Sequence, residues 1–216
     1  GTFVINTTGD AIWEEDEADT SSSAAIKCDG NLLIENGDIT IVSSGKGGKG
    51  INVDGTLTIN DGTISVTTTG DQYAYDRNND TAAKAIKSDG NLTVNGGDIT
   101  IRTYKKEAEG LESKSTLTIT NGTVIIEAYD DCINASNHIQ IDGGYIYCKS
   151  ASNDGIDSNG TLTITGGTVI SASASSPEAG FDCDQGRFSI TGGTVIGIGG
   201  DTSTPTANAS TQQSLI

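Results

Sequence analysis

The sequence repeats one phrase seven times, and this repetition limits the folds that the chain can adopt. The phrase reads Gly-Ile-x-Ser-x-Gly-x-Leu-x-Ile-x-x-Gly-x-Val-x-Ile and is clearest from Gly155 to Ile170. Successive copies start 25, 35, 25, 22, 23 and 25 residues apart. A repeat of this length is one supersecondary unit that buries its apolar face only by stacking on its neighbours. The copies start at Ile26, Ile51, Ile86, Leu111, Ile133, Ile156 and Phe181.

Each copy alternates apolar residues with Thr, Asn or Asp, as in Leu57-Thr58-Ile59, and alternation of period two indicates β-strand. Pairs such as Asn36-Gly37 and Gly166-Gly167 separate the strands and suit tight corners, because these residues tolerate positive φ. Asn-Gly pairs also mark hairpins, so an antiparallel sandwich or barrel is the rival fold. The constant order of three strands favours stacking in register. We therefore predict an all-β fold, a right-handed parallel β-helix (a solenoid) of about seven to eight coils.

The chain is predicted to form one elongated domain over residues 1–200, followed by a Ser/Thr-rich tail over residues 201–216. Residues 2–13 read as a partial first turn. Residues 213–216 end abruptly on an apolar pair, and they read as a last edge strand or as the start of a missing segment. No stretch approaches the roughly 20 apolar residues of a membrane span.

The charge of the chain is strongly negative and unevenly distributed. The net charge of −17 argues against binding of nucleic acid. Ten of the twelve Lys and Arg residues lie between Lys27 and Lys114, so the later turns are acidic with almost no compensation.

The four cysteines do not read as a disulfide framework. Cys28 and Cys183 share a repeat position but lie six turns apart, about 29 Å at the stacking distance of strands, which forbids a bond. Cys132 and Cys148 lie on different strands of one turn, where pairing is possible. We interpret all four as small core residues. No close pair of Cys or His residues indicates a zinc site.

The residue that follows the first Ile of each copy must point outward, because the Ile and Ser positions on either side of it point inward. This outward column contains Lys27, Asn52, Lys87, Glu112, Asn134, Asp157 and Asp182. The residues just before these strands include Lys49, Lys84, Glu109, Asp131 and Asp154. One face of the rod is therefore predicted to have a lysine-bearing half and a carboxylate-bearing half.

Stacked carboxylates need compensation, because two unit charges about 5 Å apart repel by roughly 3 kcal/mol at an effective dielectric near 20. A hard divalent cation is the simplest answer, and calcium accepts six to eight oxygens in flexible geometry. The candidate calcium ligands are Asp131, Asp154, Asp157 and Asp182. A solvated acidic surface without metal is the alternative.

The lysine half suggests direct contact with an anionic ligand. The candidates for holding the carboxylates of an acidic sugar are Lys27, Lys49, Lys84 and Lys87, and Asn134 lies in the same outward column. Alternatively, Lys84 and Lys87 only balance Glu109 and Glu112 as exposed ion pairs, which contribute little. The candidate platforms for stacking sugar rings are Trp13, Tyr73, Tyr75, Tyr104 and Tyr129, and packing roles remain equally open for them.

Two segments resemble motifs of pectin-acting β-helices. Asn153-Asp154-Gly155-Ile156-Asp157 looks like the Asn-Thr-Asp-Gly motif of polygalacturonases, and Asp130-Asp131-Cys132-Ile133 looks like their Asp-Asp-Cys motif. The order along the chain is reversed, and the Gly-His-Gly and Arg-Ile-Lys motifs of those hydrolases are absent. The likeness therefore supports coil geometry and acidic outer residues but not hydrolysis, and we assign no catalytic residue.

Nearly the whole chain resembles one bacterial family, on the recurring phrase, the Asn153–Asp157 turn and the Gln213-Ser214-Leu215 ending. That family comprises secreted calcium-binding β-helical carbohydrate-binding domains, related in shape to pectate lyases. The resemblance implies an extracellular or bacterial cell-surface protein that binds plant cell-wall polysaccharide, notably polygalacturonate of pectin, with cellulose as a second option. It also implies calcium bound on the first-strand face by Asp131, Asp154, Asp157 and Asp182, together with Glu112.

We therefore expect a monomeric, non-catalytic binding module. Calcium would bridge protein carboxylates to uronate carboxylates, since the field of so acidic a protein would otherwise repel an acidic polymer. One alternative is a calcium-dependent pectate lyase with Lys87 or Lys84 as the base. Adjacent Glu109 and Glu112 argue against it, because they favour charged lysine. Another alternative is a surface adhesin or structural rod without a small ligand.

Overall fold

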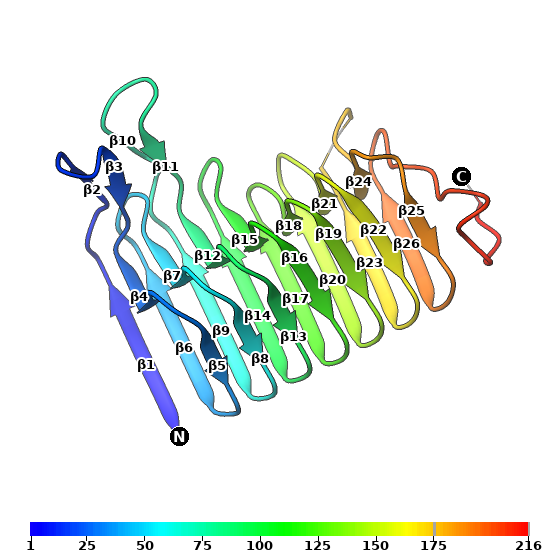
Figure 1. The fold of residues 1–216 in the computed structure, drawn as a ribbon, viewed down its shortest axis with the longest axis horizontal. Coiled ribbons are helices and arrows are strands. Elements are labelled where there is room, and N and C mark those ends of the chain that lie inside the picture. The colour runs from blue at the N-terminus through cyan, green and yellow to red at the C-terminus, as the bar shows by residue number, and fades with distance from the viewer. Residues whose placement is uncertain (175, 216) are drawn as a thin grey trace.

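The chain folds into a parallel β-solenoid (Figure 1). The computed structural model describes residues 1–174 and 176–215, and every regular element in these residues is a β-strand. The three long sheets contain seven, seven and eight strands, and all their pairings are parallel. The predicted parallel β-solenoid is thus confirmed. No helix in the described part of the chain has the length and apolarity to cross a membrane.

Each full coil contributes one strand to each of three sheets, which we name in the order of the repeated phrase. The first sheet contains β4 (Ala24–Cys28), β7 (Lys49–Val53), β12 (Lys84–Ser88), β15 (Glu109–Ser113), β18 (Ile133–Ala135), β21 (Ile156–Ser158) and β24 (Phe181–Cys183). The second sheet contains β5 (Leu32–Ile34), β8 (Leu57–Ile59), β13 (Leu92–Val94), β16 (Thr116–Ile119), β19 (His138–Ile141), β22 (Thr161–Ile164) and β25 (Phe188–Ile190). The third sheet contains β1 (Thr2–Thr7), β6 (Asp38–Ser43), β9 (Thr63–Thr68), β14 (Asp98–Thr103), β17 (Thr123–Ala128), β20 (Tyr145–Ser150), β23 (Thr168–Ala172) and β26 (Thr194–Ile198).

The register of the coils follows the repeated phrase. Ile26 pairs with Ile51, and Ile51 pairs with Ile86. The same inward column continues through Leu111, Ile133, Ile156 and Phe181. From Ile51 to Ile156 the members of this column are fully buried. Burial of one such aliphatic side chain contributes about 1.5–3 kcal/mol, so the aliphatic stack is the main source of stability.

Glycine is required where the second sheet turns into the third. Gly122 has a φ of 101°, and a Cβ added to it would lie 2.7 Å from the Gly97 carbonyl oxygen of the preceding coil. Both the backbone conformation and the close stacking therefore exclude a side chain. The same corner has positive φ at Gly37, Gly62, Gly97, Gly144, Gly167 and Gly193.

Two hairpins leave the solenoid at the corner between the third and first sheets, and Figure 1 shows them projecting above the N-terminal coils. One consists of β2 (Ile12–Glu14) and β3 (Asp19–Ser21), and the other of β10 (Tyr73–Ala74) and β11 (Asp80–Thr81). Trp13 stacks on Tyr75 with ring centroids 4.7 Å apart and an interplanar angle of 7°. We call the two joined hairpins, residues 12–21 and 73–81, the canopy.

The ends and the cysteines complete the fold. Strand β1 pairs with β6 as a partial first turn, whereas Trp13 belongs to the canopy. Beyond β26, backbone N–H groups of Ser203 and Thr206 donate to carbonyls of Phe181 and Phe188, so the tail covers the open edge of the last coil. Ile216, part of the expected final strand, lies outside the described residues. All four cysteines are free thiols, three of them buried, as expected for core residues.

Candidate functional site

The outer face of the first sheet brings all the predicted site residues onto one surface. Lys27 pairs with Asn52, and Asn52 pairs with Lys87. The same column continues through Glu112, Asn134, Asp157 and Asp182. Beside it runs a second column of Lys49, Lys84 and Glu109, which backbone hydrogen bonds to the carbonyls of Asp131 and Asp154 extend.

This outward column is less exposed than a solvated ladder would be. Glu112 is 1% exposed, Asn134 7% and Asn52 8%. Neighbouring side chains cover Glu112, since the ammonium groups of Lys84 and Lys114 both contact its carboxylate. Asn134 lies between Asp131 and Asp157 and donates to both. The face is therefore a packed polar layer, in which the side chains directly beside each charged group determine its electrostatic environment.

The lysine half lies beneath the canopy and contains two adjacent clefts. One cleft of about 270 Å³ is lined by Lys27, Lys49 and Lys87 together with acidic residues of the β2–β3 hairpin. A second cleft of about 360 Å³ is lined by Lys49, Lys84 and Lys87 together with residues of the β10–β11 hairpin. Lys49 and Lys87 thus border both clefts, and the carboxylate of Asp19 lines both as well.

Lys49 is a buried cation with hydroxyl partners. It is 5% exposed, and its Nζ donates to Ser22 Oγ and to Thr81 Oγ1, the latter at 3.2 Å. Within the described residues it makes no ion pair with a carboxylate. Burial, together with the positive charges of Lys87 and Lys84, lowers the pKa of Lys49 to about 8. An anion from outside would stabilise this ammonium group.

The centre of the face neutralises itself. Lys84 Nζ lies 2.5 Å from Glu109 Oε1 and 3.8 Å from Glu112 Oε1, and Lys87 Nζ lies 2.5 Å from Asp89 Oδ1. Burial alone would lower the pKa of Lys84, but the two glutamates outweigh it and raise that pKa. Lys84 is therefore held in its charged form, which argues against its use as a catalytic base.

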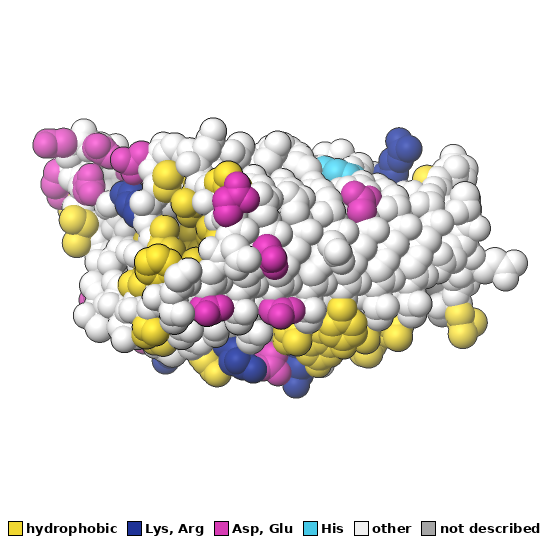
Figure 2. Space-filling view, turned by 90° about the horizontal axis from the view of Figure 1, so that it is seen from below, with side chains coloured by type: hydrophobic (Ala, Val, Ile, Leu, Met, Phe, Trp, Pro, Cys, Tyr) yellow, Lys and Arg dark blue, Asp and Glu magenta, His cyan; other side chains and the backbone are white. Residues whose placement is uncertain are grey.

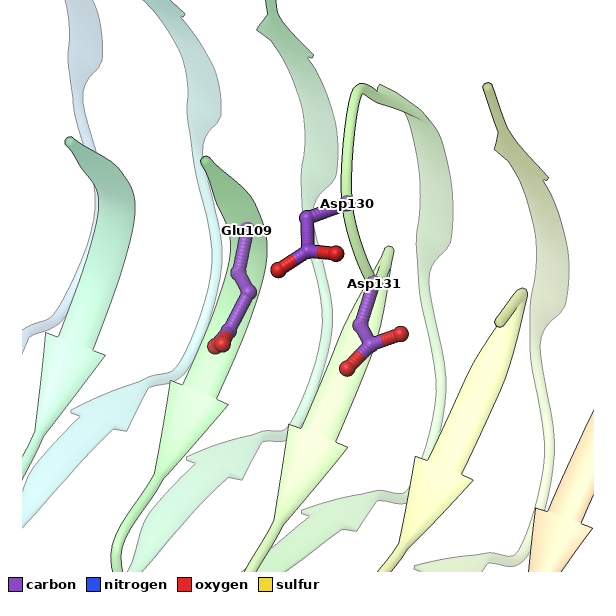
Figure 3. Close-up of side chains that lie close together, drawn as sticks. All are labelled: Glu109, Asp130 and Asp131. Atoms are coloured by element: carbon purple, nitrogen blue, oxygen red, sulfur yellow. The ribbon is translucent and has the colours of Figure 1, made fainter. Parts of the chain in front are cut away.

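Three carboxyl groups meet where the acidic half begins. Figure 3 shows Glu109 on β15 beside Asp130 and Asp131 on the segment before β18. Oxygen atoms of the three groups all lie within 4.8 Å of one another. Burial and then the neighbouring Asp130 raise the pKa of Asp131 to about 9, and burial raises the pKa of Glu109 to about 7. We call these three residues the acidic cluster.

The acidic cluster fits a hard cation such as calcium. Glu109 Oε2 is buried and has no hydrogen-bond partner, although Lys84 contacts the other oxygen of the same carboxylate. All the donors are carboxylate oxygens, the ligand type that calcium prefers. A cation here would satisfy the orphaned oxygen and offset the repulsion that raises the pKa values of the cluster.

The other predicted metal ligands flank the acidic cluster and have protein partners. Asp154 Oδ1 accepts the N–H of Ala179 at 2.5 Å, and Asp182 Oδ1 accepts that of Cys183 at 2.7 Å. Asp157 Oδ2 accepts from Asn134 Nδ2 at 2.6 Å. Burial, followed by the charges of Asp154 and Asp182, raises the pKa of Asp157 to about 7. Of the five predicted ligands, only Asp131 belongs to the acidic cluster.

Sequence reasoning missed two members of the acidic cluster. Asp130 lies one residue before the predicted column, and Glu109, although it lies in the column of Asp131, is not among the five predicted ligands. The Asp130-Asp131 pair was nevertheless visible in the Asp-Asp-Cys motif, and Glu109 precedes the strand of the preceding coil. Comparing the residues of neighbouring coils, including those one position outside the column, brings the three residues together.

Comparison with known proteins identifies the family. A family model described as carbohydrate-binding domain-containing protein matches residues 1–108 and 102–153. These matches include the canopy, the lysine half and the acidic cluster. Comparison with curated proteins and with solved structures gives no match. Because the family model covers well over half of the chain, the protein belongs to the family of carbohydrate-binding domain-containing proteins.

Proposed function

We propose that the chain binds acidic polysaccharide of the polygalacturonate class along the outer face of the first sheet, with calcium bound at the acidic cluster. The observation that carries the proposal is the charge on this face. Within the described residues, Lys49 is buried without a carboxylate partner, the acidic cluster has an oxygen without a hydrogen-bond partner, and the two lie in one column, two to three coils apart. An anion would stabilise Lys49, and a cation would stabilise the acidic cluster.

An acidic polymer would contact both ends of the face through its carboxylates. Its carboxylates would enter the clefts of the lysine half and pair directly with Lys27, Lys49 or Lys87. Further along the chain of sugars, a carboxylate would complete the coordination of calcium at Glu109, Asp130 and Asp131, because calcium accepts more oxygens than three carboxylates provide singly. This bridging explains how a protein of net charge −17 holds an anion.

The proposal also bears on location and on catalysis. Plant cell-wall polymers are encountered outside the cell, so we propose an extracellular or bacterial cell-surface location. We favour binding without catalysis, because the raised pKa of Lys84 keeps the best-placed lysine protonated. An absorbance from unsaturated uronates that grows with time, and that Lys84→Ala or Lys87→Ala abolishes, would instead make the chain a lyase.

The test is retention on immobilised polygalacturonate with calcium and with chelator. Wild type is expected to bind in calcium and to lose most of its affinity in chelator. Asp131→Asn should bind equally weakly in both buffers. Asp98→Asn removes the same charge from the third sheet and should behave as wild type, because Asp98 is exposed and far from the cluster in the register. Retention of wild type that is unchanged after full chelation would contradict the calcium bridge.

A further inference from the structure

The outer face of the third sheet carries an uncharged patch near its C-terminal end. Ile125, Tyr147, Ile170 and Ile196 are successive Cα partners on β17, β20, β23 and β26. Each alternates with a buried core residue on its own strand or faces solvent at the edge, so all four point outward. In the earlier coils the same column is polar, with Thr40, Ser65 and Thr100.

Tyrosine rings lie at the centre of this patch. Tyr145 and Tyr147 both point outward from β20, about 6.6 Å apart along the strand. Tyr145 is 42% exposed, and Ile196 and Ile198 at the edge strand are 44% and 55% exposed. Figure 2 shows apolar side chains gathered along the lower edge of the view, beside a small group of charged ones. An exposed apolar surface with a polar border marks an interaction site more often than an accident of sequence.

Few charged side chains border the patch. Of the outward positions on β17, β20, β23 and β26, only Glu127 and Lys149 are charged, although the chain as a whole carries −17. Glu127 is also paired with Arg102 of the preceding coil, at 3.1 Å. Threonine hydroxyls border the other side of the patch, at Thr123, Thr168 and Thr194. The surface therefore suits a ligand without charge that has both apolar faces and hydroxyl groups.

A second copy of the chain is a poor occupant. Four strands and three outward positions per strand span only about 14 Å by 13 Å, whereas stable protein interfaces bury about 800 Å² per partner. A second copy would also bring another charge of −17 to a surface that offers no compensation. A sugar chain needs less area, because each pyranose ring places its apolar C–H face on an aromatic ring and its hydroxyls on the border.

We propose that Tyr145 and Tyr147, with Ile125, Ile170 and Ile196, form a second carbohydrate-binding surface that takes an uncharged polysaccharide chain. This inference rests on the proposed carbohydrate binding, but it uses a different face and requires no metal. The two faces would then hold different polymers: a charged one on the first sheet and a neutral one on the third. Such a module would join two components of a composite wall.

The experiment is titration calorimetry with neutral β-linked gluco-, xylo- and manno-hexasaccharides in chelator, and with oligogalacturonate in calcium. Wild type should bind at least one neutral hexasaccharide. Tyr147→Ala should weaken that binding at least tenfold, while Tyr147→Phe should stay within about twofold, because the ring remains. Leu33→Ala removes an exposed apolar side chain from β5 of the second sheet and should change nothing. Ile170→Thr, which preserves β-propensity, should weaken binding without a change of fold.

The outcomes separate this inference from the proposed function. Binding of oligogalacturonate without any neutral sugar, or neutral binding that Tyr147→Ala leaves unchanged, would overturn the third-sheet surface alone. Neutral binding without oligogalacturonate would overturn the first-sheet proposal alone, and binding of neither would overturn both. A dimer of wild type in sedimentation that Tyr147→Ala dissociates would make the patch an interface between copies and would also overturn the inference.

Discussion

The two halves of the first sheet share one backbone and differ in what covers them. Strands β4, β7 and β12 present lysines beneath the canopy, whereas the strands from β15 to β24 present carboxylates beneath short corners. In the lysine half, the hairpins bury Lys49 and supply it with hydroxyls. In the acidic half, the side chains bury one another, and within the described residues two carboxylate oxygens, Glu109 Oε2 and Glu112 Oε2, are left without a hydrogen-bond partner. The same coil geometry thus yields one site that an anion would stabilise and one site that a cation would stabilise.

Lys49 and the acidic cluster are too far apart to neutralise each other. Lys49 and Asp131 are separated by the Lys84 and Glu109 coils, about 14 Å at the stacking distance of strands. This exceeds the Debye length of about 8 Å at physiological ionic strength, and the intervening Lys84–Glu109 pair already neutralises itself. The comparison therefore predicts that the two halves respond separately: the acidic half to cations, the lysine half to anions, and each half to pH in a different range.

The largest expected effect is stabilisation by calcium. At about 100 times its dissociation constant, calcium should raise the free energy of unfolding by about 2.7 kcal/mol, because the unfolded chain does not assemble the acidic cluster. Glu109→Gln should remove most of this gain, since it replaces the carboxylate with the orphaned oxygen. Urea unfolding with calcium and with chelator measures the difference within each variant, so the lost ion pair with Lys84 cancels.

A matched control sharpens this result. Glu127→Gln makes the same substitution on the third sheet, where Glu127 pairs only with Arg102, and it should retain the full calcium effect. If calcium leaves the free energy of unfolding of wild type unchanged, the acidic half holds no calcium, and the contrast between the halves reduces to one of packing.

The next effect is the pH dependence of the metal-free protein. The folded pKa of Asp131 is about 9, against 3.8 for the free side chain, so the unfolded chain releases this proton first. Stability in chelator should therefore fall as pH rises from about 4 towards 9. Asp131→Asn should flatten the fall, as should calcium, which favours the charged carboxylates.

Lys49 should act in the opposite sense and in a higher window. Its folded pKa is about 8 and its ordinary value is 10.5, so the unfolded chain binds the extra proton between these values. Stability should rise with pH between 8 and 10.5. Urea unfolding across the pH range separates the two contributions, because Lys49→Gln should abolish the alkaline rise and leave the fall at lower pH. A fall in Asp131→Asn as steep as in wild type would contradict the contribution of Asp131, whereas a smaller fall should remain because the pKa values of Glu109 and Asp157 are both raised to about 7.

A smaller effect is expected on direct binding by the lysine half. In chelator, Lys49→Gln should weaken the residual binding of oligogalacturonate about tenfold, or about 1.4 kcal/mol, because it removes the buried charge that faces the clefts. Lys149→Gln, which removes an exposed charge from the third sheet, should leave that binding unchanged. Equal loss in the two variants would show that only net charge matters, and the lysine half would then have no specific site.

The sequence was sufficient for the fold, because register in a solenoid depends on inward residues that recur. Ile26 through Phe181 align as predicted, and the corner glycines fall where positive φ is needed. The sequence also placed the charged columns on one face. It was insufficient for exposure: Glu112 and Asn134 point outward as predicted but are buried, because neighbouring coils place partners over them.

The canopy and the acidic cluster escaped prediction for a related reason. Residues 2–13 read as a partial turn, since nothing in the sequence around Trp13 or Tyr75 alone indicates that the two rings meet across an intervening coil. The acidic cluster likewise joins a residue of one coil with two of the next. The period of the repeat and its columns of equivalent positions predict contacts between the repeated strands. They do not predict contacts between the segments that interrupt the repeat.

The smallest predicted effect concerns the canopy itself. Trp13→Ala removes the ring that stacks on Tyr75 and should destabilise the junction of the hairpins by about 1 kcal/mol. Because the canopy covers only the lysine half, the amides of residues 73–81 should exchange faster with solvent, and binding of oligogalacturonate in chelator should weaken a few fold.

The calcium effect should stay intact, since the acidic cluster contacts neither hairpin through a hydrogen bond or an ion pair within the described residues. Hydrogen exchange and titration calorimetry test both expectations, with Leu33→Ala as an exposed apolar control. A loss of the calcium effect in Trp13→Ala would show that the two halves are coupled, and the comparison between them would no longer hold.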